Sequence, residues 1–172
     1  APRDYVRVLN MESGEVSVSF RDGASRFERS MFVSRAQDII AYEITRTGSK
    51  PIDVKFSLDL HERFNARTPT AISKLPDGVN TKYENYFMYF SARSDNGTEF
   101  GVVGFINHYG GSQQVSADGI RISGASSVLV LLKPFVESQR EKEWKGLKTK
   151  LSSIKSTYEK LLKEHTPQHS KL

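Results

Sequence analysis

Alternation of apolar and polar residues, with a period of two, runs through most of this chain and constrains its fold more than any other feature. In the segment IDVKFSLDL, residues 52–60, five apolar side chains fall on one side of an extended backbone and four polar ones on the other. The segment EVSVSF, residues 15–20, repeats the pattern. A strand with one apolar and one polar face is typical of antiparallel sheets, so we expect sheets of that kind.

Pairs that contain glycine separate the apolar runs, and each supplies a residue that tolerates positive φ. These pairs are Ser13-Gly14, Asp22-Gly23, Gly48-Ser49, Asn96-Gly97 and Asp118-Gly119. The pattern predicts strands near residues 5–10, 15–22, 25–34, 38–47, 51–60, 84–93, 98–107, 112–117, 119–123 and 126–133. Because no helical pattern interrupts them, we predict an all-β antiparallel sandwich over residues 1–136, with a barrel as the other all-β arrangement.

One stretch of this region lacks the alternation of apolar and polar residues. Residues 61–82, HERFNARTPTAISKLPDGVNTK, contain two Pro, one Gly, two Asn and three Thr without sustained periodicity. Long irregular loops are uncommon in compact domains unless they are functional or disordered, so we expect a loop here.

After Pro134 the period changes to that of a helix. Apolar residues recur at steps of three and four and form one stripe: Trp144, Leu147, Leu151, Ile154, Tyr158, Leu161, Leu162 and His165. We predict one amphipathic linker helix from about residue 137 to residue 164, ending at Thr166-Pro167 because the residue before proline disfavours helical geometry. Residues 137–172 therefore form a separate unit in this prediction, and the stripe either covers the chain's own sheet or reaches toward a neighbouring domain.

The charge and composition argue against several classes of protein. The net charge is +5, but residues 137–172 carry nine Lys/Arg against five Asp/Glu, and the first 136 residues are nearly neutral. No basic face with interleaved aromatics is evident, so we predict no nucleic-acid partner. No apolar run approaches the roughly 20 residues of a membrane helix, so we predict no membrane partner. Cysteine is absent, which excludes disulfides and thiolate metal sites within the chain.

A search for catalytic chemistry finds no complete constellation. Histidine occurs at positions 61, 108, 165 and 169, and the pair His165 and His169 has helical metal-ligand spacing, but Pro167 lies between them and is expected to break the helix. Asp59, Glu62 and Asp77 flank the irregular segment without marking a carboxylate pair. Neither a phosphate loop nor a nucleophile elbow is present. We predict no catalytic residue, no metal and no cofactor in this chain.

The order of these segments resembles the N-terminal region of family-95 glycoside hydrolases, the α-L-fucosidase family. The opening segment, YVRVLNMESGEVSVSFRDGASRFERSMFVSRAQDIIAYEI, matches at Tyr5, Arg7, Leu9, Met11, Gly14, Val16, Val18, Phe27, Arg29, Phe32, Ser34, Ile39 and Ile40. DGIRISGASSVLVLLKPF is similar to a later strand pair, and WKGLKTKLSSIKSTYEKLLKEH to the linker helix, with Tyr158, Leu161, Leu162 and His165 at its end. Departures include Val6, Val8 and Asn10, and the aromatic expected after His165 is missing.

This resemblance implies a truncated N-terminal β-sandwich, preceded by further strands and followed by an (α/α)6 catalytic barrel that is absent here. The parent enzyme would hydrolyse an α-fucosyl or α-galactosyl oligosaccharide with inversion, and would act outside the cytoplasm, in the periplasm or after secretion. We expect the catalytic domain of the same parent chain to be the partner, with Trp144, Leu147, Leu151, Ile154 and Tyr158 as interdomain helix anchors. His61, Glu62, Arg63, Asn65 and Arg67 would belong to a loop close to the sugar cleft.

An alternative hypothesis is a free-standing carbohydrate-binding or adhesive sandwich. Sugar-binding surfaces present exposed aromatic rings, and the segment ENYFMYFSAR offers Tyr86, Phe87, Tyr89 and Phe90. Of these, Tyr86 and Phe90 are the expected sugar contacts, with Phe87 and Tyr89 facing inward. A purely structural module is the third hypothesis.

Overall fold

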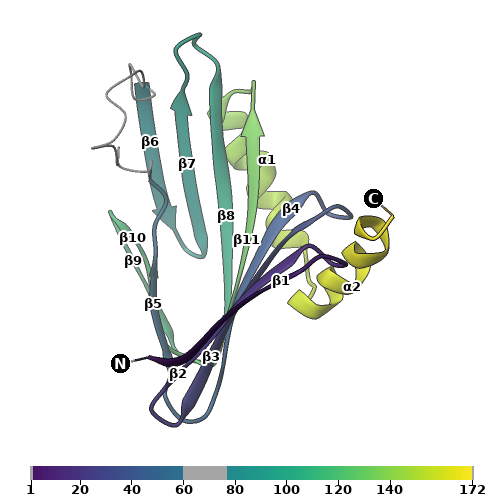
Figure 1. Cartoon of the computed structure of the whole chain (residues 1–172). Helices are drawn as coiled ribbons and strands as arrows, with labels where there is room; N and C mark the ends of the chain where they lie inside the picture. The colour runs from purple at the N-terminus through teal and green to yellow at the C-terminus, as the bar shows by residue number, and fades with distance from the viewer. Residues whose placement is uncertain (1, 60–76, 172) are drawn as a thin grey trace, which may run out of the picture.

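The structure is a computed structural model, and it describes residues 2–59 and 77–171 (Figure 1). Its main element is an antiparallel sheet of eight strands in the order β1-β2-β3-β4-β11-β8-β7-β6. The strands are β1 (Arg3–Asn10), β2 (Glu15–Asp22), β3 (Ser25–Ser34), β4 (Ile39–Thr47), β6 (Asp77–Glu84), β7 (Phe87–Arg93), β8 (Glu99–Tyr109) and β11 (Ser127–Val136). Strand β11 pairs with both β4 and β8, so the sequence-distant halves of the sheet meet at its centre.

A second antiparallel sheet of three strands has the order β5-β10-β9. Its strands are β5 (Ile52–Phe56), β10 (Gly119–Ala125) and β9 (Ser112–Ser116). The side chains that it turns toward the large sheet include Ile52, Ile120 and Ile122, all buried in one apolar cluster with Ile44, Ile106 and Val130 of the large sheet. The predicted all-β sandwich is confirmed, as two unequal sheets.

Two helices cover the opposite face of the large sheet: α1 (Arg140–Ser153) and α2 (Tyr158–His169) (Figure 1). Helix α1 packs on β7, β8 and β11, and α2 packs on β3 and β4. A second apolar cluster fills this layer, with Leu147, Leu151, Tyr158 and Leu161 from the helices against residues such as Phe32 and Leu131 from the sheet. The central strands of the large sheet are therefore buried on both faces, and the molecule has three layers.

The prediction of one unbroken helix was wrong. Residues 154–157 are not helical, and Thr157 begins α2 as an N-cap whose hydroxyl accepts a hydrogen bond from the Lys160 N–H at 3.3 Å. The break lets the two helices follow different strands of a twisted sheet. Pro167 was expected to end the helix but lies inside α2, because packing of Leu161 and His165 on the sheet holds the last turn in place. None of the helices in the described residues is both long and apolar enough to span a membrane.

Strand boundaries differ from the prediction around the irregular segment. Residues 77–82 belong to strand β6, whereas the sequence predicted a loop through residue 82. Strand β5 ends at Phe56 rather than at residue 60. Strand β7 begins at Phe87 because Asn85 and Tyr86 form a turn, in which Tyr86 has a φ of 65°. Gly78 and a register shift between Asp77 and Asn80 interrupt the alternation that would have revealed β6.

Candidate binding surface at the open side of the sandwich

The small sheet leaves part of the large sheet uncovered. Strand β5 contacts β4, β10 contacts β8, and β9 contacts β6. Strands β1, β2 and β3 continue the large sheet beyond β4, past the edge of the small sheet. The face of β1–β3 on the same side as the small sheet is the candidate binding surface, and we call it the open face.

Cross-strand pairing places apolar side chains in rows on the open face, because directly opposed residues share a face. One row consists of Leu9, Val16, Met31 and Tyr42. Leu9 is 56% exposed and Met31 is 42% exposed, and Val16 and Val33 are exposed as well. Side chains of this kind are normally buried when they occur together, so the open face is a contiguous apolar patch of the type that marks interaction sites.

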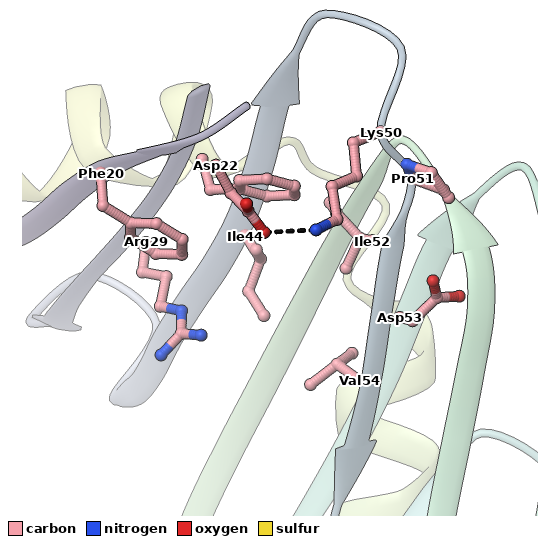
Figure 2. A pocket seen from close by; sticks show the side chains of 10 residues that line it. Phe20, Asp22, Arg29, Ile44, Lys50, Pro51, Ile52, Asp53 and Val54 are labelled. Carbon is pink, nitrogen blue, oxygen red and sulfur yellow. Dashed lines mark hydrogen bonds and ion pairs between the residues drawn. The ribbon is translucent and has the colours of Figure 1, made fainter. Parts of the chain in front are cut away.

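A pocket of about 260 Å³ lies where the open face meets β5. Figure 2 shows Ile52 and Val54 projecting from β5 on one side of it and Phe20 and Arg29 of the large sheet on the other. The Phe20 and Phe27 rings stack with their centroids 5.5 Å apart. Phe27 is buried and Phe20 is only partly covered, so the pocket is the mouth of the apolar core between the sheets.

Charged groups surround the opening of this pocket. The Lys50 ammonium donates to the Asp22 carboxylate (Figure 2), and this hydrogen bond and charge hold the pKa of Asp22 below its usual value. The Arg29 guanidinium lies 5.6 Å from the centre of the Phe20 ring, and within the described residues it forms neither a salt bridge nor a side-chain hydrogen bond. Asp53 on β5 accepts the Gly124 N–H at 2.9 Å. A lowered pKa is the opposite of what a general acid needs, so Asp22 is not suited to that role.

The histidine pair lies elsewhere, on the last turns of α2. Because the helix continues through Pro167, His165 and His169 share a face, with ring centroids 5.2 Å apart. Nδ1 of His165 accepts the Arg35 N–H at 3.1 Å, and its Nε2 donates to the Ser13 carbonyl at 2.9 Å. Both ring nitrogens are thus occupied by the backbone. Within residues 2–59 and 77–171, no group of three or more His, Asp and Glu side chains could hold a metal ion.

The predicted helix anchors lie against the chain's own sheet. Leu147, Leu151 and Tyr158 are buried in the cluster between the helices and the large sheet, and Trp144 and Ile154 pack against it. The Trp144 ring lies 5.1 Å from that of Tyr89. These contacts give the five residues a role within the chain, and their role as interdomain anchors stays a prediction.

Glu84, which the sequence did not single out, ties α1 to the β6–β7 turn. Its carboxylate accepts hydrogen bonds from Lys148 at 2.7 Å, Lys82 at 2.8 Å and Tyr89 at 2.6 Å. These bonds lower the pKa of Glu84 to about 2. The network stabilises the helical layer.

The aromatic segment proposed as a sugar-binding surface is mostly internal. Phe87 and Tyr89 face the helices, as expected, but Phe90 is only 7% exposed and cannot form an open platform. Tyr86 is exposed and lies beside His108, with ring centroids 6.1 Å apart. The predicted sugar-proximal residues His61, Glu62, Arg63, Asn65 and Arg67 lie outside the described residues.

Sequence reasoning missed the open face, although one signal was present. Alternation in SRFERSMFV places Phe27, Arg29, Met31 and Val33 on one side of β3, and Phe32 on the other. Both sides therefore carry apolar residues, which is a mark of a strand in the middle of a layered fold. The sequence could not show that the covering sheet has only three strands.

The fold and this surface define a class: a β-sandwich domain with a helical cover and an open apolar face, without a catalytic constellation in its described residues. The chain belongs to the family of glycosyl hydrolase family 65 N-terminal domains, because the family model matches residues 1–134. It is similar in structure to a putative kojibiose phosphorylase from human microbiome, with a TM-score of 0.68 and 11% sequence identity. That match covers 98% of this chain and 25% of the other, so the chain spans a quarter of that protein's length. No curated protein matches.

The family match confirms the broader part of the resemblance. The chain is an N-terminal β-sandwich domain of a glycosyl hydrolase family, as the segment order indicated, but the family is 65 and not specifically 95. The family model ends at residue 134, and the structural match extends over almost the whole chain. The two helices therefore belong to the shared architecture as well as the strands.

Proposed function

We propose that this chain is the non-catalytic N-terminal support domain of a longer carbohydrate-active enzyme, whose catalytic domain lies elsewhere in the same polypeptide. The observation that carries the proposal is the helical layer, which is fixed to the sheet by a buried apolar cluster. A loose linker would not bury Leu147, Leu151, Tyr158 and Leu161. A segment that follows α2 therefore begins from a defined position on the sandwich.

Polar contacts fix the second helix further. The Tyr158 hydroxyl donates to the Glu15 carboxylate at 2.8 Å, and His165 bridges Ser13 and Arg35. Gly14 allows this close approach: it has a φ of 63°, and a Cβ atom at this position would lie 2.9 Å from Cε1 of His169. The β1–β2 turn, the β3–β4 turn and α2 thus form one rigid end of the domain. We propose that this end orients the catalytic domain, and that the predicted helix anchors hold the helices in the position that this requires.

The parent enzyme, in this proposal, cleaves a glycosidic bond. The family description supports a glycosyl hydrolase, and the name of the similar structure adds phosphorolysis as a second reaction type. In inverting hydrolysis a carboxylic acid protonates the leaving oxygen while a base activates water. In phosphorolysis inorganic phosphate takes the place of water as the attacking group. Neither the acid nor the base is assigned to a residue of this chain.

The test is a paired assay of this chain and of the product of its complete reading frame. Both are incubated with α-fucosyl and α-galactosyl substrates, and with kojibiose in the presence and absence of inorganic phosphate. We expect the longer product to cleave at least one substrate and the 172-residue chain to cleave none. Release of sugar only with phosphate identifies a phosphorylase, and release without it identifies a hydrolase. Activity of the 172-residue chain alone, or a reading frame that ends at Leu172, would contradict the proposal.

A further inference from the structure

Another pocket lies at the β6–β7 turn, at the opposite edge of the large sheet from β1 (Figure 1). It has a volume of about 320 Å³ and is lined by Glu84, Asn85, Val115 and Lys148. Glu84 ends β6 and Asn85 belongs to the turn, whereas Val115 lies on β9 and Lys148 on α1. The large sheet, the small sheet and the helical layer therefore each contribute to this pocket.

The polar groups of the pocket are held in place but retain capacity for further hydrogen bonds. Oε1 of Glu84 accepts from Lys148 and Tyr89, and Oε2 accepts from Lys82 at 2.8 Å. A carboxylate offers about four acceptor positions, so Oε2 can accept another hydrogen bond. Lys148 has further N–H donors beside the one that binds Glu84. The Asn85 side chain is exposed and forms no hydrogen bond with any described residue.

Tyr86, the next residue of the turn, has a backbone conformation that bulky residues rarely adopt. Its φ is 65°, in the left-handed region that favours glycine. Its carbonyl accepts the Ile106 N–H at 2.8 Å, which fixes the turn to β8. The side chain is 45% exposed, so burial of the ring does not offset the strain. Residues held in such conformations cluster at functional sites, and this one displays an aromatic ring to solvent.

The Tyr86 ring has a polar neighbour in His108. The two ring centroids are 6.1 Å apart. Nδ1 of His108 lies 2.8 Å from the Gly110 carbonyl, and because a carbonyl only accepts, this nitrogen carries the proton. Nε2 of the neutral ring is then a hydrogen-bond acceptor. The pair thus offers the face of a tyrosine ring, a phenol hydroxyl and an imidazole acceptor.

This set of groups fits a sugar better than a charged ligand. The Glu84 carboxylate would repel an anion, and the Lys82 and Lys148 ammonium groups would repel a cation. Hydroxyl groups both donate and accept, so they can bind the carboxylate, the ammonium and the Asn85 amide together. The apolar face of a pyranose ring can pack on an exposed tyrosine. The pocket volume is at the lower end of the range for small-molecule sites, which suits a single sugar ring.

We propose that the β6–β7 turn is a binding site for a neutral oligosaccharide. One pyranose ring enters the pocket and hydrogen-bonds to Glu84, Asn85 and Lys148, and the adjoining ring stacks on Tyr86 beside His108. Asn85 and Tyr86 are consecutive, with Cα atoms about 3.8 Å apart, so their side chains can contact neighbouring units of one glycan. The site goes beyond the proposed function because it needs no catalytic domain. In a longer enzyme it would raise the effective concentration of the glycan at the molecule.

The test is an NMR titration of the ¹⁵N-labelled 172-residue chain with three disaccharides: kojibiose, an α-galactosyl glucose and an α-fucosyl galactose. We expect at least one of them to shift the amide signals of residues 84–86, 108 and 148, with a dissociation constant in the millimolar range, because a polar ligand of this size binds weakly. Inorganic phosphate, the anionic probe, should shift none of them. No shift at this turn with any disaccharide at about 50 mM, or shifts with phosphate alone, would overturn the proposal.

The variant Tyr86→Gly separates binding from folding. Glycine suits the positive φ of this position, so the variant should be at least as stable as the wild type in urea unfolding. Loss of the ring should raise the dissociation constant of the disaccharide about tenfold. The matched control is Tyr109→Ala, which removes a 77% exposed tyrosine at the end of β8 and should leave binding unchanged.

A second variant tests the pocket itself. Asn85→Ala removes the unpartnered amide and should weaken binding several-fold. Wild-type affinity in Tyr86→Gly or in Asn85→Ala would contradict the proposal. A marked loss of stability in Tyr86→Gly would also contradict it, because the ring would then have a structural role.

Failure of this inference and failure of the proposed function give different results. If the complete product cleaves a glycoside while the 172-residue chain shows no shifts at the β6–β7 turn, the proposed function holds and this inference is wrong. If the chain binds a disaccharide at this turn while the complete product cleaves none, the inference holds and the free-standing carbohydrate-binding hypothesis replaces the proposed function.

Discussion

At the scale of single residues, His165 is a buried polar group that is held by several contacts. It is 2% exposed, and its ring stacks on Phe32 with centroids 5.1 Å apart. Each of its two ring nitrogens forms a hydrogen bond with a backbone group, and the two backbone groups belong to different turns. Nδ1 must be unprotonated to accept the Arg35 N–H. Burial lowers the pKa of His165 below its usual value, and the nearby His169 and Arg35 act in the same direction, against the hydrogen bond to Ser13. The folded state therefore holds the neutral imidazole.

This predicts a loss of stability in mild acid. Unfolded histidine takes up a proton below a pH of about 6.5, and the folded state resists protonation. The unfolded state then binds more protons, so the free energy of unfolding falls as the pH drops from about 6.5 toward the folded pKa. We expect this loss in the free energy of unfolding to be about 1 kcal/mol, the contribution of one hydrogen bond. The variant His165→Gln keeps one donor and one acceptor but does not titrate, so it should remove the loss.

The measurement is urea unfolding of the wild type and the variant between pH 7.5 and pH 5.5. His108→Gln serves as the control, because it removes an imidazole that contacts Tyr86 rather than α2. The control should keep the wild-type pH dependence. An unchanged slope in His165→Gln would show that another group causes the loss.

At the scale of the elements, the start of α2 depends on a local N-cap hydrogen bond. The helical stripe of the sequence is continuous through residues 154–157, yet the backbone leaves the helix there and resumes after Thr157. The Thr157 hydroxyl satisfies one of the N–H groups that a helix start leaves unpaired. Ile154, at the end of α1, still packs against the apolar cluster, so the stripe is kept while its axis changes direction.

Removing the cap should therefore weaken α2. Thr157→Ala leaves the Lys160 N–H without its partner and should lower the free energy of unfolding by about 1 kcal/mol. Thr149→Ala is the matched control: this exposed residue lies within α1, and alanine is the better helix former there, so we expect no loss. Chemical denaturation of both variants at pH 7 gives the comparison. A loss of equal size in both would argue against capping as the cause.

The sequence predicted most strands correctly, for a physical reason. Alternation and glycine turns located β2 and β3 to the residue: β2 lies between two such turns, and β3 follows one of them. Strand β6 was missed because Gly78 and a register shift disturb its alternation. The partition into eight and three strands could not be predicted, since period-two alternation shows which residues share a face but not which strands share a sheet. In β11, the run VLVLL packs on both layers, and in retrospect it indicates the central position.

The candidate site was less predictable than the fold. Its groups come from β2, β3, β4 and β5 and from the turn before β5, and they meet only through the stacking of the two sheets. Arg29 and Lys50 look like ordinary surface charges in the sequence. The open face results from the unequal widths of the two sheets, which no local pattern encodes.

At the scale of the whole molecule, the central question is whether the helices belong to the domain. The sequence predicted a boundary after residue 136, with residues 137–172 as a linker. In the structure, the apolar cluster under the helices includes Phe32, Ile39, Val103 and Leu131 of the large sheet, each at most 2% exposed. Without α1 and α2 this second face of the sheet would be open to water, in addition to the face of β1–β3 that is already open.

Truncation after Val136 should consequently abolish cooperative folding. The four helix side chains Leu147, Leu151, Tyr158 and Leu161 are buried, and at about 2 kcal/mol each they contribute roughly 8 kcal/mol. That is comparable to the total stability of a domain, about 5 to 15 kcal/mol. We expect residues 1–136 to lose near-ultraviolet circular dichroism and to unfold without a cooperative transition, and the peptide 137–172 added in excess to restore both in part. A truncated chain that remains monomeric and unfolds cooperatively would show instead that the helices are an appended linker, as the sequence predicted, and that the sheet alone supports its own core.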